Sequence, residues 1–184
     1  MIDLELINLI GKENTWASCV EMDCYGLPID EITAYLAAHV EHPSLNIGAG
    51  FRNYIEPTYA LDGCSVNLLA NPLPTSRKTE FDLDDIAHGI ALPFESQSLK
   101  TAYMVSVWQY VADRKSLADE IMRIAKKMII INVRNAGWGH LTVGPTSPSK
   151  IQRECEDCGY KCSVDTIVDD CYAVTVTTPH YAAP

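Results

Sequence analysis

A short apolar run that ends in two glycines constrains the fold of this chain more than any other feature. The run Leu45-Asn46-Ile47 leads directly into Gly48-Ala49-Gly50. Glycine has no Cβ and adopts positive φ readily, so the backbone can turn sharply there and a ligand can lie against it. A strand that opens onto such a turn is typical of nucleotide-like ligand sites at the edge of an α/β sheet. An ordinary tight turn is the alternative interpretation of the same residues.

Helix-like and strand-like patterns alternate along the rest of the chain. Apolar residues at helical spacing predict an amphipathic helix over 29–40, and residues 1–25 have a helical tendency. Further strands are expected at 64–69, 79–83, 102–107, 128–133, 160–165 and 171–177, with a helix from an N-cap at Ser116 to Lys126-Lys127 and another over 149–158. This alternation predicts a doubly wound α/β sheet with an antiparallel pair at its C-terminal end.

Length and composition narrow the classes of protein. The 184 residues predict a single domain, 1–184, with an N-terminal helical segment over 1–43 and a core over 44–178. The formal charge of −10 disfavours nucleic acid as a partner, because binding to it depends on Lys and Arg. Without a run of about 18 apolar residues no membrane span is expected. The N-terminus carries Asp3 and Glu5 instead of a basic segment, so a cytoplasmic location is expected.

The seven cysteines predict reduced thiols, because an odd number without a secretory signal is typical of the cytosol. Cys155, Cys158 and Cys162 have a spacing that zinc sites also use. Gly159 is expected to end the preceding helix and to divide these cysteines between a helix and a strand. Small thiols that face a core produce the same pattern. No metal site is predicted, although the cluster leaves zinc as an open alternative.

Three stretches follow one another along the chain. The first is the glycine turn at 45–50. The second is Phe81-Asp82-Leu83 followed by Leu92-Pro93-Phe94. The third is the stretch 107–111 followed by Glu120-Ile121-Met122-Arg123. In this order they resemble the first-strand cofactor loop, the segment after the third strand, and the fourth-strand exit with its following helix in class I S-adenosylmethionine-dependent methyltransferases of the small type-11 sort. The resemblance covers about residues 44–178 and implies a Rossmann-like, mostly parallel seven-stranded sheet with an antiparallel C-terminal strand.

The resemblance also implies S-adenosylmethionine as the cofactor and a small-molecule or protein side-chain methyl acceptor. In that family the glycine loop passes the methionine part of the cofactor. An acid that ends the second strand binds the ribose hydroxyls, and an acid after the third strand receives the adenine amine. The cofactor-binding candidates are Asn46, Gly48, Ala49, Gly50, Asn67, Asp82, Asp84 and Ser106. The acceptor-binding candidates are Trp108, Gln109, Trp138 and His140.

Three departures from the family pattern keep a second hypothesis open. Asn46 stands where the family often has an acid, and 51–53 replace the third glycine. The stretch 66–72, where the second strand is expected to end, contains no carboxylate. A methyltransferase-like binding or assembly protein without catalysis is therefore the alternative to an active enzyme. A nicotinamide dehydrogenase is disfavoured, because its third glycine and ribose acid have no clear counterpart.

Overall fold

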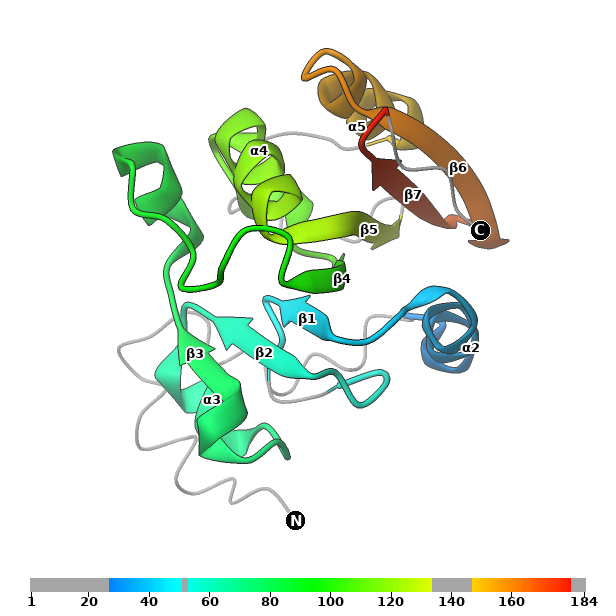
Figure 1. Cartoon of the computed structure of the whole chain (residues 1–184). Coiled ribbons are helices and arrows are strands. Elements are labelled where there is room, and N and C mark those ends of the chain that lie inside the picture. The colour runs from blue at the N-terminus through cyan, green and yellow to red at the C-terminus, as the bar shows by residue number, and fades with distance from the viewer. Residues whose placement is uncertain (1–26, 51–52, 134–146, 180–184) are drawn as a thin grey trace.

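A computed structural model describes residues 27–50, 53–133 and 147–179 of the chain (Figure 1). Seven strands in these residues form one sheet in the order β3-β2-β1-β4-β5-β7-β6. The strands are β1 (Ser44–Ile47), β2 (Tyr59–Asp62), β3 (Lys78–Glu80), β4 (Leu99–Val105), β5 (Ala125–Val133), β6 (Lys161–Val168) and β7 (Cys171–Thr177). The first five pair in parallel, and β7 is antiparallel to both β5 and β6. This confirms the predicted mostly parallel sheet with its antiparallel C-terminal end.

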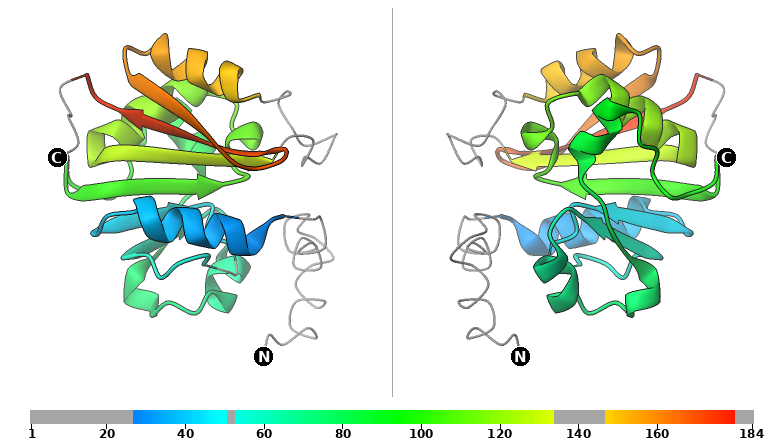
Figure 2. Two further views of the ribbon diagram at one scale, coloured as in Figure 1. Left: turned by 90° about the vertical axis from the view of Figure 1, so that its right-hand side faces the viewer. Right: turned by 90° about the vertical axis from the view of Figure 1, so that its left-hand side faces the viewer.

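Helices cover both faces of the sheet (Figure 2). On one face, α2 (Ile29–His39) buries Ile32 and Leu36 against β4, β5 and β7. On the other face, α4 (Arg114–Ile124) and α5 (Pro148–Glu156) enclose the larger apolar cluster. The short helix α3 (Ser65–Ala70) contacts β2 and β3. The arrangement is the predicted doubly wound one, whereas the single-domain boundaries and the helical tendency of 1–25 stay predictions.

The prediction of a second strand at 64–69 is wrong. The second strand is β2 (Tyr59–Asp62), and the residues assigned to it form helix α3 instead. A short apolar run has no period long enough to separate strand from helix, so pairing with neighbours decides. In the folded chain Ala60 and Leu61 are paired on both sides, by β1 and β3, and are fully buried.

Boundaries of α4 and β3 also differ from their predictions. Helix α4 begins at Arg114, and Asp113 is its N-cap, with its carboxylate accepting from the Ser116 N–H at 3.0 Å. Ser116 is therefore inside the first turn. The helix ends at Ile124 because β5 begins at once, so 126–127 are strand residues. Strand β3 covers 78–80 and not 79–83, since residues from Leu83 onward form a 3-10 helix, η3 (Leu83–His88).

Two of the stretches that carried the family resemblance are bonded to each other. Glu120 in α4 accepts from the Leu92 N–H at 2.6 Å and holds Arg123 through both carboxylate oxygens, at 2.6 and 2.7 Å. Arg123 donates in turn to the carbonyls of Leu92 and Phe94, at 3.1 and 3.0 Å. The segment after η3 is thereby fixed along α4.

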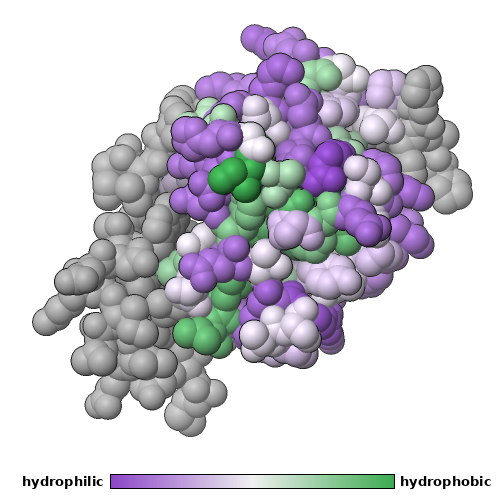
Figure 3. Space-filling model, turned by 60° about the vertical axis from the view of Figure 1, so that its left-hand side comes forward, coloured by the Kyte–Doolittle hydropathy of each residue, from purple (hydrophilic) through white to green (hydrophobic). Residues whose placement is uncertain are grey.

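Two large apolar side chains between β2 and β4 are exposed. Leu69 in α3 is 73% exposed and Ile90, just after η3, is 50% exposed. Figure 3 shows the side of the molecule to which α3 and η3 belong, with apolar side chains gathered among polar ones. No helix within the described ranges is long and apolar enough to cross a membrane.

Candidate functional site

The turn after β1 uses both of its glycines in the left-handed backbone region. Gly48 has φ +63° and Gly50 has φ +57°. A Cβ on Gly48 would lie 2.4 Å from Val107 Cγ2, whereas a Cβ on Gly50 would meet no atom within 4 Å. Glycine is therefore required at position 48 for two reasons, namely its positive φ and the close approach of the chain after β4. Gly50 is required by its φ alone.

Asp62 ends β2 beside this turn. Its Oδ2 accepts from the Gly50 N–H at 2.8 Å, and its Oδ1 accepts from the Cys64 N–H at 2.8 Å and from Asn67 Nδ2 at 3.3 Å. The expectation that no carboxylate ends the second strand is therefore wrong, and the error follows from placing that strand at 64–69. The signal was the short apolar run Tyr59-Ala60-Leu61 immediately before Asp62. Asn67, predicted at a strand end, lies in α3 and supports Asp62.

A cavity of about 480 Å³ lies at the carboxyl ends of the parallel strands. It brings together four of the predicted cofactor residues, Gly48, Asp82, Asp84 and Ser106, with Asp62. The remaining lining residues are Gly63, Cys64, Leu83, Val105, Val107, Tyr110 and Val111. All charged lining residues are acidic, so the cavity suits a ligand with positive charge.

The individual acids and Ser106 are positioned by local structure. Asp82 is the N-cap of η3, and its carboxylate accepts from the Asp84 N–H at 3.0 Å. Both aspartates are exposed, so their carboxylate oxygens can accept further hydrogen bonds. Ser106 has φ +55°, and its N–H donates to the Ile131 carbonyl at 2.9 Å. That bond ties the start of the connection after β4 to the neighbouring strand β5.

The other four predicted cofactor residues do not line the cavity. Asn46 is 3% exposed and donates to Asn53 Oδ1 at 3.1 Å. Ala49 is 6% exposed, and its N–H donates to the Leu61 carbonyl at 3.0 Å. Gly50 and Asn67 contact the carboxylate of Asp62, as described above. A direct contact between any predicted residue and a cofactor stays a prediction.

The predicted acceptor residues are placed differently. Trp108 is 1% exposed and packs in the larger core, with Nε1 donating to Glu154 Oε2 at 3.0 Å, and it is not among the residues that line the cavity beside Gly48. Gln109 is 2% exposed and donates to the Ser106 carbonyl at 3.0 Å, one residue from the cavity lining. Trp138 and His140 lie outside the described residues.

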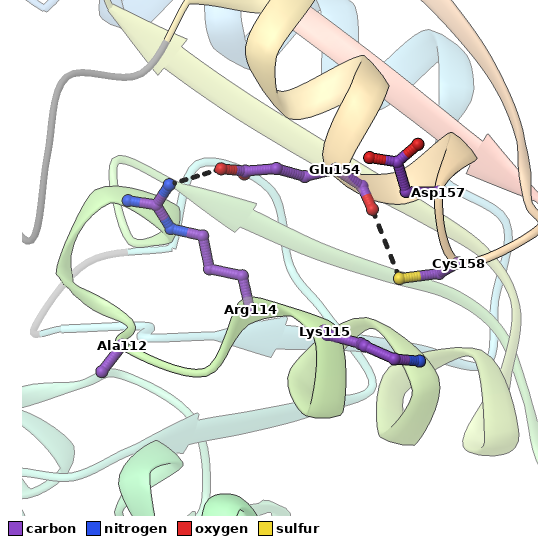
Figure 4. Close-up of a pocket in the computed structure, with 6 residues that line it drawn as sticks. All are labelled: Ala112, Arg114, Lys115, Glu154, Asp157 and Cys158. Atoms are coloured by element: carbon purple, nitrogen blue, oxygen red, sulfur yellow. Dashed lines mark hydrogen bonds and ion pairs between the residues drawn. The ribbon is translucent and has the colours of Figure 1, made fainter.

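A second cavity, of about 320 Å³, lies between the start of α4 and the end of α5 (Figure 4). Arg114 Nη1 and Glu154 Oε1 form an ion pair at 2.9 Å, and the Cys158 thiol donates to the Glu154 carbonyl at 3.3 Å. Arg114 and Glu154 therefore neutralise each other's charge at this cavity. The described ranges contain no group of three His, Cys, Asp or Glu that could hold a metal.

Known proteins support the fold through similarity of structure and not through similarity of sequence. No family model matches the chain, and no curated protein matches it. Among solved structures, a chain from the Haloferax volcanii complex of the Trm112 methyltransferase activator with a methyltransferase has a TM-score of 0.68 at 18% identity, covering 94% of this chain and 97% of that one. A Thermotoga maritima SAM-dependent methyltransferase has a TM-score of 0.66 at 12% identity, covering 88% and 97%. One from Aquifex aeolicus has a TM-score of 0.61 at 14% identity, covering 96% and 98%. The chain therefore has the fold of class I S-adenosylmethionine-dependent methyltransferases.

Proposed function

We propose that this protein is an S-adenosylmethionine-dependent methyltransferase that acts on a small molecule or a protein side chain. The observation that carries the proposal is the cavity where the glycine turn, Asp62 and the Asp82–Asp84 pair meet. S-Adenosylmethionine, when bound, supplies a methyl group on a positively charged sulfur. An acid-lined cavity at the carboxyl ends of parallel strands fits such a cationic ligand.

Each lining residue has a role that its position allows. Asp62 is held by three donors from Gly50, Cys64 and Asn67, so its carboxylate is oriented to accept a ribose hydroxyl. Asp82 and Asp84 follow β3 and offer acceptors for an amine of the adenine ring. Ser106 and Val107 face the cavity at the end of β4, close to Gly48. Methyl transfer chiefly requires alignment of nucleophile, methyl and sulfur, so these positioning roles account for the proposed chemistry.

A binding or assembly protein of the same fold is the second candidate function. Its support is the side chain of Val107, which lies close against Gly48 at the lining of the cavity. The exposed side chains of Leu69 and Ile90 offer apolar contacts to a partner. One similar structure is itself a complex with a methyltransferase activator, and a protein partner of that kind fits either candidate function.

Isothermal titration with S-adenosylmethionine and S-adenosylhomocysteine tests the proposal directly. We expect both to bind the parent protein. Asp62→Asn is expected to weaken binding by about tenfold or more, because a charge-assisted hydrogen bond is lost. Asp157→Asn is the matched control, since it makes the same change at an exposed residue of the second cavity. No binding at millimolar concentration would contradict the proposal, and binding without transfer of a labelled methyl group to any acceptor would favour the second candidate.

A further inference from the structure

The peptide groups of Gly50 are held from both sides by side chains of the segment from β2 to the end of α3. Asp62 Oδ2 accepts from the Gly50 N–H at 2.8 Å. Asn71 Nδ2 donates to the Gly50 carbonyl at 3.1 Å. Because Gly50 has φ +57° and no side chain, these two bonds decide how its backbone is oriented. The turn after β1 therefore takes its shape from residues that follow it in the sequence.

Asn71 is 2% exposed, and hydrogen bonds of its backbone N–H and carbonyl hold it in place. Its N–H donates to the Asn67 carbonyl at 2.9 Å at the end of α3, and its carbonyl accepts from Lys78 Nζ at 2.5 Å. Its side-chain Oδ1 accepts from the Leu73 N–H at 3.1 Å. A buried polar group with its partners complete specifies one geometry, so Asn71 presents its Nδ2 to Gly50 in a fixed direction.

Two further amides extend this arrangement back to β1. Asn71 and Asn53 exchange hydrogen bonds, with Asn53 Nδ2 donating to Asn71 Oδ1 at 2.9 Å and Asn71 Nδ2 donating to Asn53 Oδ1 at 3.2 Å. Asn46 Nδ2 donates to the same Asn53 Oδ1 at 3.1 Å. Asn46 is the residue that stands where the family often has an acid. The chain of amides Asn46–Asn53–Asn71, which we call the amide chain, is uncharged along its whole length.

We propose that Asn71 is a positioning residue for the cofactor turn, and that the amide chain holds the Gly50 carbonyl in the orientation that admits the ligand. This inference rests on the proposed function. An amide can do this because it donates and accepts at once. A carboxylate in place of Asn71 could still accept from Leu73 and Asn53, but it would set an oxygen against both the Gly50 carbonyl oxygen and Asn53 Oδ1. The role thus depends on the single donor that Asn71 directs at Gly50.

Asn71→Asp tests the donor by pH. At about pH 8 the introduced carboxylate is charged and cannot donate, so we expect S-adenosylhomocysteine to bind about tenfold more weakly than to the parent. Burial raises the pKa of a carboxyl, whereas the Lys78 ammonium, which donates to the carbonyl of residue 71, lowers it. The titration is therefore carried down to about pH 4, where the acid gains a proton and can donate to Gly50 again. The ratio of the variant's Kd to the parent's Kd should then fall toward one. Asn71→Ala lacks any donor and should bind weakly at both pH values.

Gln152→Glu is the control for the same change from amide to carboxylate at a residue outside the cavity. Gln152 lies in α5, where its Nε2 donates to Glu156 Oε1 at 2.7 Å. The expected change in Kd is less than about twofold at either pH. If Asn71→Asp does not fold, Asn53→Ala takes its place as the test variant. It removes the side-chain amide in the middle of the amide chain, at a half-buried position, and should weaken binding by about threefold or more.

The outcomes separate this inference from the proposed function. If the parent does not bind S-adenosylhomocysteine, both are contradicted. If the parent binds and Asn71→Asp is equally weak at both pH values, or binds like the parent at both, only the inference is overturned. Unfolding curves measured at each pH show whether a variant is folded. A change in stability without a change in the Kd ratio would show that Asn71 is merely structural.

Discussion

Gly48 and Gly50 share a backbone conformation but differ in their surroundings, and this makes them a matched pair. Both have positive φ, which costs an alanine about 1 kcal/mol. Only Gly48 also lies against another side chain, that of Val107. The two residues thus separate the cost of backbone strain from the cost of crowding at the cavity.

Gly50→Ala should lower the free energy of unfolding by about 1 kcal/mol, and Gly48→Ala should lower it by about 1–3 kcal/mol more. The reason is the 2.4 Å approach of the new Cβ to Val107 Cγ2. In the background of Val107→Ala, Gly48→Ala should lose most of that extra cost. Urea unfolding of the parent, the singles and the double variant measures all of these values. Equal losses at Gly48 and Gly50 would show that Val107 does not crowd the turn.

At the scale of elements, the pairing of Glu120 with Arg123 is what joins α4 to the segment after η3. Burial favours the neutral form of Glu120, but its hydrogen bonds from Arg123 and from the Leu92 N–H outweigh burial and lower its pKa. The charged carboxylate is therefore the form that the fold stabilises. A lowered pKa means that this stability is present above the unfolded pKa of about 4.3 and is lost as pH falls through the folded value.

Glu120→Gln should lower the free energy of unfolding by about 1–3 kcal/mol at neutral pH, because bonds to a charged acceptor are weakened. The difference from the parent should shrink as pH falls below about 4.3. Lys115 and Asp119, in the same helix, form an exposed ion pair, so Asp119→Asn is a control with a loss of at most about 1 kcal/mol. Chemical unfolding at several pH values tests this. A difference between Glu120→Gln and the parent that does not change with pH would contradict the assignment.

For the whole molecule, the sheet order decides which regions are most stable. Strand β5 lies between β4 and β7, and its residues Met128–Ile131 are fully buried. Strands β3 and β6 are the two edges of the sheet, and β6 is largely exposed. The cavity lies over the carboxyl ends of β1, β2 and β4, so it is supported by the interior of the sheet and bordered by the β3 edge.

Native-state hydrogen exchange should show that the interior strands are more stable than the edge strands. Amides of β4 and β5 should be the slowest to exchange, because they open only when the whole fold opens. Amides of β3 and the outer edge of β6 should exchange at least about tenfold faster. Mass spectrometry of peptides from each strand gives the rates. A β6 peptide as protected as β5 would show that a second molecule covers this edge in solution.

The sequence by itself determined the features that depend on residues close together in the chain. The glycine turn, the continuous apolar strand over 128–133 and the alternation of helices and strands were all predictable, because short-range periodicity and backbone preference encode them. The order of the motifs was enough to predict the class I methyltransferase fold. Local signals were weakest where an apolar run was short, as at 64–69.

Only the tertiary structure decided which polar groups meet. Asp62 became a candidate ligand residue once pairing of β2 with β1 and β3 showed where that strand ends. Trp108 was a candidate acceptor residue from sequence, and only the folded chain shows that its indole N–H donates to Glu154, which is 46 residues away. The bond between Asn71 and Gly50 joins residues 21 apart that no local pattern connects. Such contacts depend on buried donors finding acceptors across the fold, and that requirement is met in three dimensions and not along the chain.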